Sequence, residues 1–124
     1  MAHATTVLLV EDEVMISHLV AESLSEHGFI VHESATASDA LNFLTSGAEV
    51  DVLFTDINLP GGMDGRELAR KARQLRPDLP IVYASGHYQL TDMGALVPRS
   101  VFLSKPYDPN DVGTLLARLT DRAH

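Results

Sequence analysis

The stretch DVLFTDINLP, residues 51–60, decides the fold, because in it an apolar run leads directly into a carboxylate. Val52, Leu53 and Phe54 follow one another without polar alternation, which is typical of a strand buried on both faces of a parallel sheet. Asp56 comes shortly after, although burying a charged side chain is costly unless another group compensates it. The stretch therefore predicts a buried parallel strand with a carboxylate at its end.

Similar apolar runs lie on both sides of this stretch. Three of them are as clear, at residues 7–10, 81–84 and 101–103, and a weaker fifth lies at 29–31. Because these runs are continuous and short, they predict five strands of one sheet that is covered on both faces.

Helical patterns fill the intervals between the predicted strands. One apolar stripe joins Ile16, Leu19, Val20 and Leu24; further patterns run from Thr36 to Gly47, from Leu68 to Leu75, and from Val112 to Leu119 with Asp108 as N-cap. Strands that alternate with helices predict an α/β fold with a doubly wound five-stranded parallel sheet in the flavodoxin-like order 2-1-3-4-5, with helices on both faces. The segment Gln89–Arg99 has only a loose pattern, and we expect a short or mobile helix there.

The length, composition and charge of the chain exclude several classes of protein. The 124 residues suit a single domain, with a core from about residue 5 to residue 121. The absence of cysteine excludes disulfides and thiolate metal sites, and the net charge of −8 without a basic patch argues against a nucleic-acid partner. Without an 18-residue apolar run or a signal-like N-terminus, we expect no membrane association and a cytoplasmic location.

Polar residues follow the predicted strands at the points where they end. Glu11 and Asp12 follow the first strand, Asp56 the third, Ser85 the fourth and Lys105 the fifth. In an open parallel sheet these carboxyl ends share one edge, and the ligand crevice of the order 2-1-3-4-5 lies between strands one and three. The sequence therefore predicts that three carboxylates meet there, with a lysine and a hydroxyl beside them.

Such a cluster needs positive charge, because clustered carboxylates repel one another. Lys105 offsets one charge, and the hard oxygen ligands favour Mg²⁺, with Mn²⁺ as a substitute. A metal held by carboxylates, a lysine and a hydroxyl suit the handling of a phosphoryl group, and an aspartate can itself be the nucleophile. Asp56 is the best candidate for that nucleophile because of its central position.

These residues resemble a known family, the receiver domains of two-component response regulators, from about Thr5 to the last helix. The resemblance rests on separated motifs that agree in type and order: the acidic pair Glu11-Asp12, Asp56 in LFTDINLPGGMDG, Ser85 in IVYASG, and Lys105-Pro106 in FLSKP. It implies the CheY-like fold and a phosphorylation-controlled switch that is not an enzyme and has no output domain of its own.

The resemblance also assigns roles to residues. Asp56 would be the phosphoacceptor, and Mg²⁺ would be held by Glu11, Asp12, Asp56 and the backbone carbonyl of Asn58. Ser85 would bond a phosphoryl oxygen and shift on phosphorylation.

Two further roles come from the same resemblance. Lys105 would pair with the phosphoryl group, with a cis bond to Pro106, and Phe102 stands where the family often has a switching aromatic. Departures from the family pattern are visible: Ser85 stands where threonine is common, Phe102 lacks a tyrosine hydroxyl, and the loop at residues 60–65 is one residue longer than the usual form.

The implied partners are proteins. The phosphoryl donor would be a phosphohistidine on a sensor histidine kinase or a histidine phosphotransfer protein, and an unidentified downstream protein would receive the signal. The chain would be a monomer or a dimer that forms on activation.

Other interpretations remain open at this point. The chain could be a protein-binding module that works without phosphorylation, or a Mg²⁺-dependent phosphatase with Asp56 as nucleophile. The acidic residues Glu11, Asp12 and Glu13 could merely favour the N-terminus of the first helix through its dipole, and His87 could be an ordinary loop histidine. The basic residues of the third helix, Arg66, Arg70, Lys71, Arg73 and Arg76, predict a solvated face.

Overall fold

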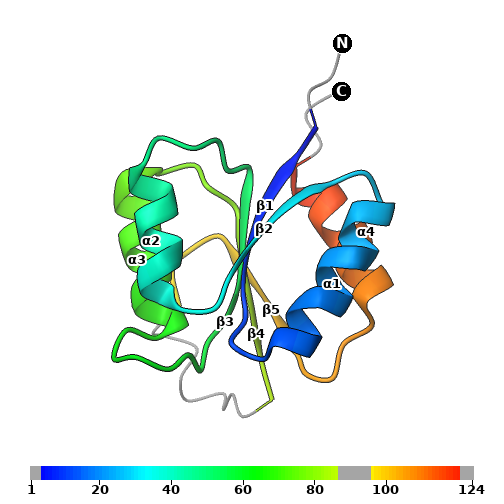
Figure 1. The fold of residues 1–124 in the computed structure, drawn as a ribbon. Coiled ribbons are helices and arrows are strands. Elements are labelled where there is room, and N and C mark those ends of the chain that lie inside the picture. The colour runs from blue at the N-terminus through cyan, green and yellow to red at the C-terminus, as the bar shows by residue number, and fades with distance from the viewer. Residues whose placement is uncertain (1–3, 87–95, 121–124) are drawn as a thin grey trace.

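The computed structural model describes residues 4–86 and 96–120, which form one five-stranded parallel sheet between two layers of helices (Figure 1). The spatial order of the strands is β2-β1-β3-β4-β5, and every neighbouring pair is parallel. This confirms the predicted topology. The strand bounds are Thr6–Val10 (β1), Ile30–Ser34 (β2), Val52–Asp56 (β3), Ile81–Ser85 (β4) and Ser100–Ser104 (β5).

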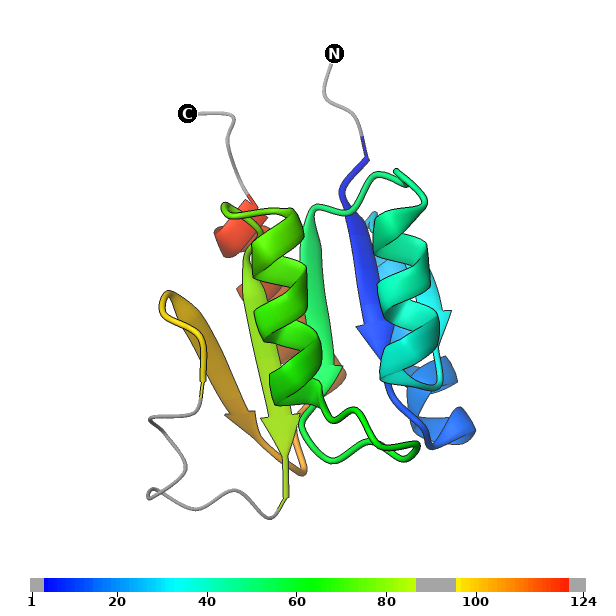
Figure 2. The same cartoon turned by 90° about the vertical axis from the view of Figure 1, so that its left-hand side faces the viewer.

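Four helices cover the sheet in pairs. The views in Figures 1 and 2 place α1 and α4 on one face and α2 and α3 on the other. The helix bounds are Val14–Glu26 (α1), Ala37–Thr45 (α2), Gly65–Leu75 (α3) and Pro109–Thr120 (α4). Two N-caps are as predicted: the Thr36 hydroxyl accepts from the Asp39 N–H at 3.1 Å, and the Asp108 carboxylate accepts from the Asn110 N–H at 2.9 Å.

The core consists of two apolar layers, one on each face of the sheet. Every residue of β3 and of β4 is buried, as the continuous apolar runs predict for central strands of a covered parallel sheet. One layer packs the sheet against α2 and α3, and the other packs it against α1 and α4. The central strands are thereby fixed on both faces, and their ends form a rigid base for the polar groups that follow.

The register brings these ends to a common level. Val10 pairs with Thr55, Asp56 with Ala84, and Ser85 with Ser104. The residues that follow β1 and β5 therefore come beside the ends of β3 and β4, as the topology predicts for this edge.

Some expectations needed correction. The second strand is Ile30–Ser34 rather than 29–31, because it is an edge strand whose exposed His32 and Glu33 hide it from an apolar pattern. The stripe on the first helix would bury Leu19, yet this side chain is 62% exposed. His87 and residues 89–95 of the loosely patterned segment lie outside the described residues.

The basic face of α3 is only partly solvated. The Arg73 guanidinium donates to the carbonyl oxygens of Leu79, Pro98 and Arg99 at 2.8, 2.7 and 2.9 Å. Arg76 donates to the carbonyl oxygens of Leu44 and Ala48. Both arginines therefore tie α3 to neighbouring connections, a structural use that the sequence pattern did not predict. None of the helices in the described part of the chain combines the length and the apolar character that crossing a lipid bilayer requires.

Candidate functional site

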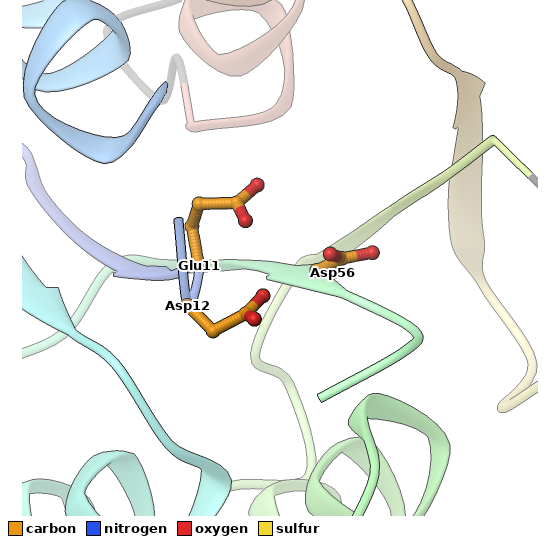
Figure 3. A group of neighbouring side chains, drawn as sticks. All are labelled: Glu11, Asp12 and Asp56. Carbon is orange, nitrogen blue, oxygen red and sulfur yellow. The ribbon is translucent and has the colours of Figure 1, made fainter. Parts of the chain in front are cut away.

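Three carboxylates meet at the carboxyl ends of β1 and β3. Glu11, Asp12 and Asp56 each offer an oxygen atom, and these atoms lie within 4.8 Å of one another (Figure 3). Glu11 is 4% exposed and Asp56 9% exposed, whereas Asp12 is exposed to solvent. The structure thus assembles the predicted acidic cluster, open to solvent on the side of Asp12.

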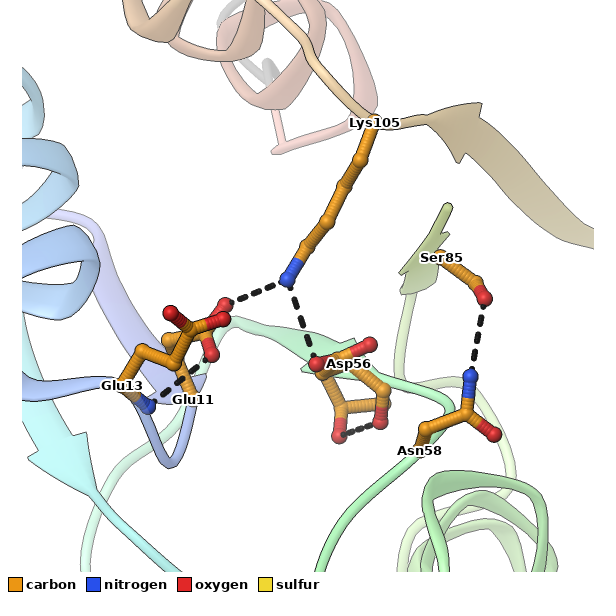
Figure 4. A network of polar contacts seen from close by, with 7 residues as sticks. Glu11, Glu13, Asp56, Asn58, Ser85 and Lys105 are labelled. Carbon is orange, nitrogen blue, oxygen red and sulfur yellow. Dashed lines mark hydrogen bonds and ion pairs between the residues drawn. The ribbon is translucent and has the colours of Figure 1, made fainter. Parts of the chain in front are cut away.

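Lys105, the residue that follows β5, contacts two of these carboxylates. Its Nζ donates to Glu11 Oε1 at 2.8 Å and to Asp56 Oδ2 at 3.2 Å (Figure 4). The peptide bond between Lys105 and Pro106 is cis, in agreement with the resemblance. The ammonium group therefore neutralises part of the negative charge at the site.

Backbone hydrogen bonds hold the site residues at the strand ends. The Glu11 N–H donates to the Ser34 carbonyl at 3.0 Å, and the Lys105 N–H donates to the Ser85 carbonyl at 3.1 Å. A carboxylate oxygen of Glu11 also accepts from the Glu13 N–H at 3.1 Å. Glu11 and Lys105 directly follow their strands, and these backbone hydrogen bonds tie them to the ends of the neighbouring strands β2 and β4.

The fold opposes the charge of the buried carboxylates. Burial raises the pKa of Asp56, and the charge of Asp12 adds to this rise, while Lys105 and the N–H of Asn58 act against it. Burial likewise raises the pKa of Glu11 against the effect of Lys105. For Lys105, burial alone lowers the pKa, but the hydrogen bond to Glu11 and the charges of Asp56 and Glu11 outweigh it, so the net shift is upward. Lys105 alone leaves part of the negative charge uncompensated.

The donor set fits a divalent cation. Two buried carboxylates with raised pKa values and a third exposed carboxylate supply hard oxygen ligands at a spacing that one ion could bridge. A cation there would offset the repulsion among the three carboxylates that Lys105 does not neutralise. Few protein ligands are present, so water or substrate would complete the coordination, as Mg²⁺ commonly requires.

Ser85 lies at the end of β4 and is 2% exposed. Its hydroxyl accepts a hydrogen bond from the side-chain amide of Asn58 at 3.1 Å (Figure 4). This use of the Asn58 side chain did not follow from the sequence, where only its carbonyl was of interest. The hydrogen bond depends on how the Asn58 side chain is oriented, and the strand pattern of the sequence does not indicate that orientation.

Phe102 lies on β5, three residues before Lys105. It is partly buried and packs against the apolar layer between the sheet and helices α2 and α3. Its place is compatible with the switching role that the resemblance implies, and that role stays a prediction.

An apolar groove adjoins the site on the side of α1. It has a volume of about 510 Å³ and is lined by Ile16, Leu19, Val20, Lys105, Pro106, Tyr107 and Pro109. The Tyr107 ring packs against Phe54 with centroids 5.6 Å apart, and burial raises the pKa of its hydroxyl to about 12. Val14 and Met15, which are 60% and 79% exposed, extend apolar surface at the start of α1. Lys105 belongs both to this groove and to the carboxylate site.

Comparisons of the sequence and of the structure with known proteins agree on one family. The family model of the response regulator receiver domain matches residues 7–117. A solved response regulator receiver protein from Sinorhizobium medicae WSM419 is 34% identical, with a TM-score of 0.91 over 98% of each chain. The chain thus resembles that protein in sequence and over its whole structure.

Curated relatives are longer proteins. Sensor kinase CckA of Brucella abortus (strain 2308) is 32% identical over 96% of this chain, which spans 13% of that protein. Regulatory protein VirG of Agrobacterium tumefaciens (strain 15955) is 36% identical over 91% of this chain, which spans 41% of it. The chain therefore matches one portion of each relative.

Proposed function

Because the chain belongs to the response regulator receiver domain family, we propose that it is a phosphorylation-controlled switch that accepts a phosphoryl group from phosphohistidine onto Asp56. The observation that carries this proposal is the contact of Asp56 with Lys105 inside the cluster of three carboxylates. An aspartate in that setting has an acidic neighbourhood for a metal and a fixed cation for a phosphoryl group.

The proposed reaction is a phosphoryl transfer between two side chains. A carboxylate oxygen of Asp56 attacks phosphorus, a P–O bond forms, and the P–N bond to the donor imidazole breaks. The bonding electrons stay with the imidazole nitrogen, so no oxidant or reductant is needed. Lys105, already 3.2 Å from Asp56, is placed to attract the negative oxygens of the transferred group.

Glu11, Asp12 and Asp56, with the backbone carbonyl of Asn58, would hold the divalent cation. Mg²⁺ when bound would neutralise charge on the transferring phosphoryl group. Burial keeps Glu11 and Asp56 fixed for this purpose, whereas exposed Asp12 leaves the entry side open. Ser85 supplies a hydroxyl at the end of the neighbouring strand, where it would bond a phosphoryl oxygen.

The donor would dock on the apolar surface beside the site. The groove along α1 reaches Lys105, and Val14, Met15 and Leu19 expose apolar side chains around it. Exposed apolar patches of this kind mark protein interaction sites. A donor protein with an apolar face next to its phosphohistidine would bury them while it presents phosphorus to Asp56. A sensor histidine kinase or a histidine phosphotransfer protein has that chemistry.

The test is the mass of the intact protein after incubation with acetyl phosphate, with and without Mg²⁺. We expect one added phosphoryl group on the native protein, and none on Asp56→Asn or without Mg²⁺. Glu13→Gln is the matched control, since Glu13 is an exposed neighbour outside the carboxylate cluster, and it should still be labelled.

Other outcomes point to the rival functions. Labelling of Asp56→Asn at full stoichiometry would refute the assignment of the phosphoacceptor. A folded native protein that accepts nothing from acetyl phosphate or from a phosphorylated histidine kinase would favour a phosphorylation-independent binding module. Sustained release of phosphate from small phosphomonoesters would favour a phosphatase.

A further inference from the structure

Asn58 contacts both Asp56 and Ser85. Its backbone N–H hydrogen-bonds the carboxylate of Asp56, and its side-chain Nδ2 donates to Ser85 Oγ at 3.1 Å. Figure 4 shows the Ser85 hydroxyl directed toward the Asn58 amide, while the Asp56 carboxylate is joined to Lys105. One residue of the loop after β3 therefore links the proposed phosphoacceptor to the neighbouring hydroxyl.

Ser85 and Asn58 differ in conformational freedom. Ser85 is 2% exposed at the end of a fully buried strand, so its backbone is fixed by the sheet. A serine side chain then has a single rotation, and its hydroxyl occupies one of three staggered positions. Asn58 is exposed, and its amide reaches the hydroxyl from the solvent side. In the structure the hydroxyl occupies a position in which it accepts the hydrogen bond from this amide.

This bond also determines that the Ser85 hydroxyl acts as the acceptor and the Asn58 amide as the donor. An amide N–H can only donate, so Ser85 Oγ accepts and its own hydrogen points away from Asn58. A hydroxyl that is to donate to a phosphoryl oxygen on Asp56 must bring its oxygen toward that group. Rotation of the side chain away from Asn58 stretches and breaks the existing bond.

We propose that the side-chain amide of Asn58 restrains the Ser85 hydroxyl in the unphosphorylated state, so that the phosphorylated state forms only when this bond breaks. The inference rests on the proposed function and deepens it, because it assigns Asn58 as a positioning residue that acts through Ser85. Removal of the amide should favour the phosphorylated conformation. A neutral hydrogen bond of ordinary strength corresponds to a change in equilibrium of roughly 2- to 12-fold.

The experiment uses beryllofluoride, a phosphoryl mimic, with saturating Mg²⁺, and measures its affinity by NMR titration of the full chain. Four proteins form a double-mutant cycle: the native protein, Asn58→Ala, Ser85→Ala and the double variant. We expect Asn58→Ala to bind the mimic roughly 2- to 12-fold more tightly than the native protein. In the Ser85→Ala background the same substitution should change nothing, because no hydroxyl is left to restrain.

Mg²⁺ affinity without the mimic is the control for a merely structural role. Asn58→Ala keeps the backbone carbonyl, so any change in its Mg²⁺ affinity should be smaller than the change in its affinity for the mimic. A general loosening of the loop would weaken Mg²⁺ binding and would act equally with and without Ser85.

The outcomes separate this inference from the proposed function. Equal or weaker binding of the mimic by Asn58→Ala, with a native protein that binds it, would overturn the restraint and leave the switch intact. An effect of equal size in both backgrounds would also overturn it. A native protein that binds Mg²⁺ but not the mimic would overturn the proposed function and the restraint together.

Discussion

Asp56 lies where its surroundings oppose its charge. Burial raises its pKa and Asp12 adds to the rise, so the folded state keeps the proton at pH values where the unfolded chain has lost it. Between those two pKa values, stability therefore falls as the pH rises. At neutral pH and without metal, the ionised carboxylate of Asp56 therefore lowers the stability of the folded state.

Asp56→Asn should therefore stabilise the metal-free protein. An amide cannot ionise, so we expect the variant to unfold at a higher temperature than the native protein at pH 7, where burial opposes the charge of Asp56. The gain should shrink as the pH falls toward the ordinary aspartate value of 3.8, where the native side chain is protonated as well. Thermal unfolding in a chelating buffer, followed by circular dichroism across pH, measures it.

Glu22→Gln is the control for net charge, because it removes one negative charge from an exposed position on α1. It should change stability little at any of these pH values. A native protein that is as stable as Asp56→Asn at pH 7 without metal would contradict the argument from burial.

At the scale of single residues, the sequence predicted which groups meet. Glu11, Asp12, Asp56 and Lys105 could be placed because each follows a recognisable strand, and parallel topology brings strand ends to one edge. The amide of Asn58 could not be placed on Ser85 in the same way. Its contact depends on a side-chain rotation, which strand periodicity does not encode.

Gly65 shows how a helix can depend on a strand end. It is the first residue of α3, and its N–H donates to the Ile57 carbonyl at 2.8 Å. A Cβ atom at this position would lie 2.0 Å from the Asp56 carbonyl oxygen and 2.9 Å from Ile57 Cα. Both are backbone atoms that the sheet holds, so only glycine lets α3 begin this close to the site.

Gly65→Ala should therefore destabilise the protein and disturb the metal site together. Overpacking against fixed backbone costs about 1–3 kcal/mol, and relief of the clash would push the Asp56 backbone out of place. We expect a lower midpoint in urea unfolding and weaker Mg²⁺ binding in an NMR titration of the same sample.

Gly86→Ala is the matched control. Within residues 4–86 and 96–120, a Cβ atom there would meet only the Lys105 Cβ, at 3.7 Å, which is an ordinary contact at the end of the next strand. It should leave the urea midpoint and Mg²⁺ affinity close to native values. Native Mg²⁺ affinity in Gly65→Ala would show that the clash is absorbed elsewhere.

At the scale of elements, the sequence predicted helices and strands with regular patterns correctly, but it did not predict which faces of the edge strand and of helix α1 are exposed. The capped helices α2 and α4 and the buried strands β3 and β4 follow local rules, so their sequences were sufficient. The edge strand β2 was displaced in the prediction because three of its five residues are exposed and do not alternate with buried ones. Helix α1 carries apolar residues beyond those the core buries, and periodicity alone cannot separate a core face from a docking face.

The whole molecule places its exposed apolar surface and its carboxylate site side by side. Leu19 of α1 is 62% exposed and lines the groove that reaches Lys105. Leu75 is 47% exposed on α3, a helix that covers the opposite face of the sheet (Figure 1). The two leucines are alike in exposure and differ in position. They therefore allow a paired test of the proposed docking surface.

Leu19→Glu should slow phosphoryl transfer from a phosphorylated histidine kinase that labels the native protein, by about fivefold or more, as for an interface residue worth at least 1 kcal/mol. Labelling by acetyl phosphate should be unchanged, because a small donor needs no docking surface. Leu75→Glu should behave like the native protein with both donors. If both leucine variants slow the kinase reaction equally, the groove is not the docking site.

The contact of Lys105 with the carboxylates has a consequence for how the protein is made. Lys105 lies 49 residues after Asp56 and 94 after Glu11 in the chain. Synthesis runs from the N-terminus, so a ribosome releases the acidic residues well before the lysine that offsets them. Before Lys105 emerges, pairing of β1 with β3 would bring the three carboxylates together without the ammonium group that offsets them, so we expect the sheet to close fully only once β5 has emerged. Translation thus delivers the neutralising charge last.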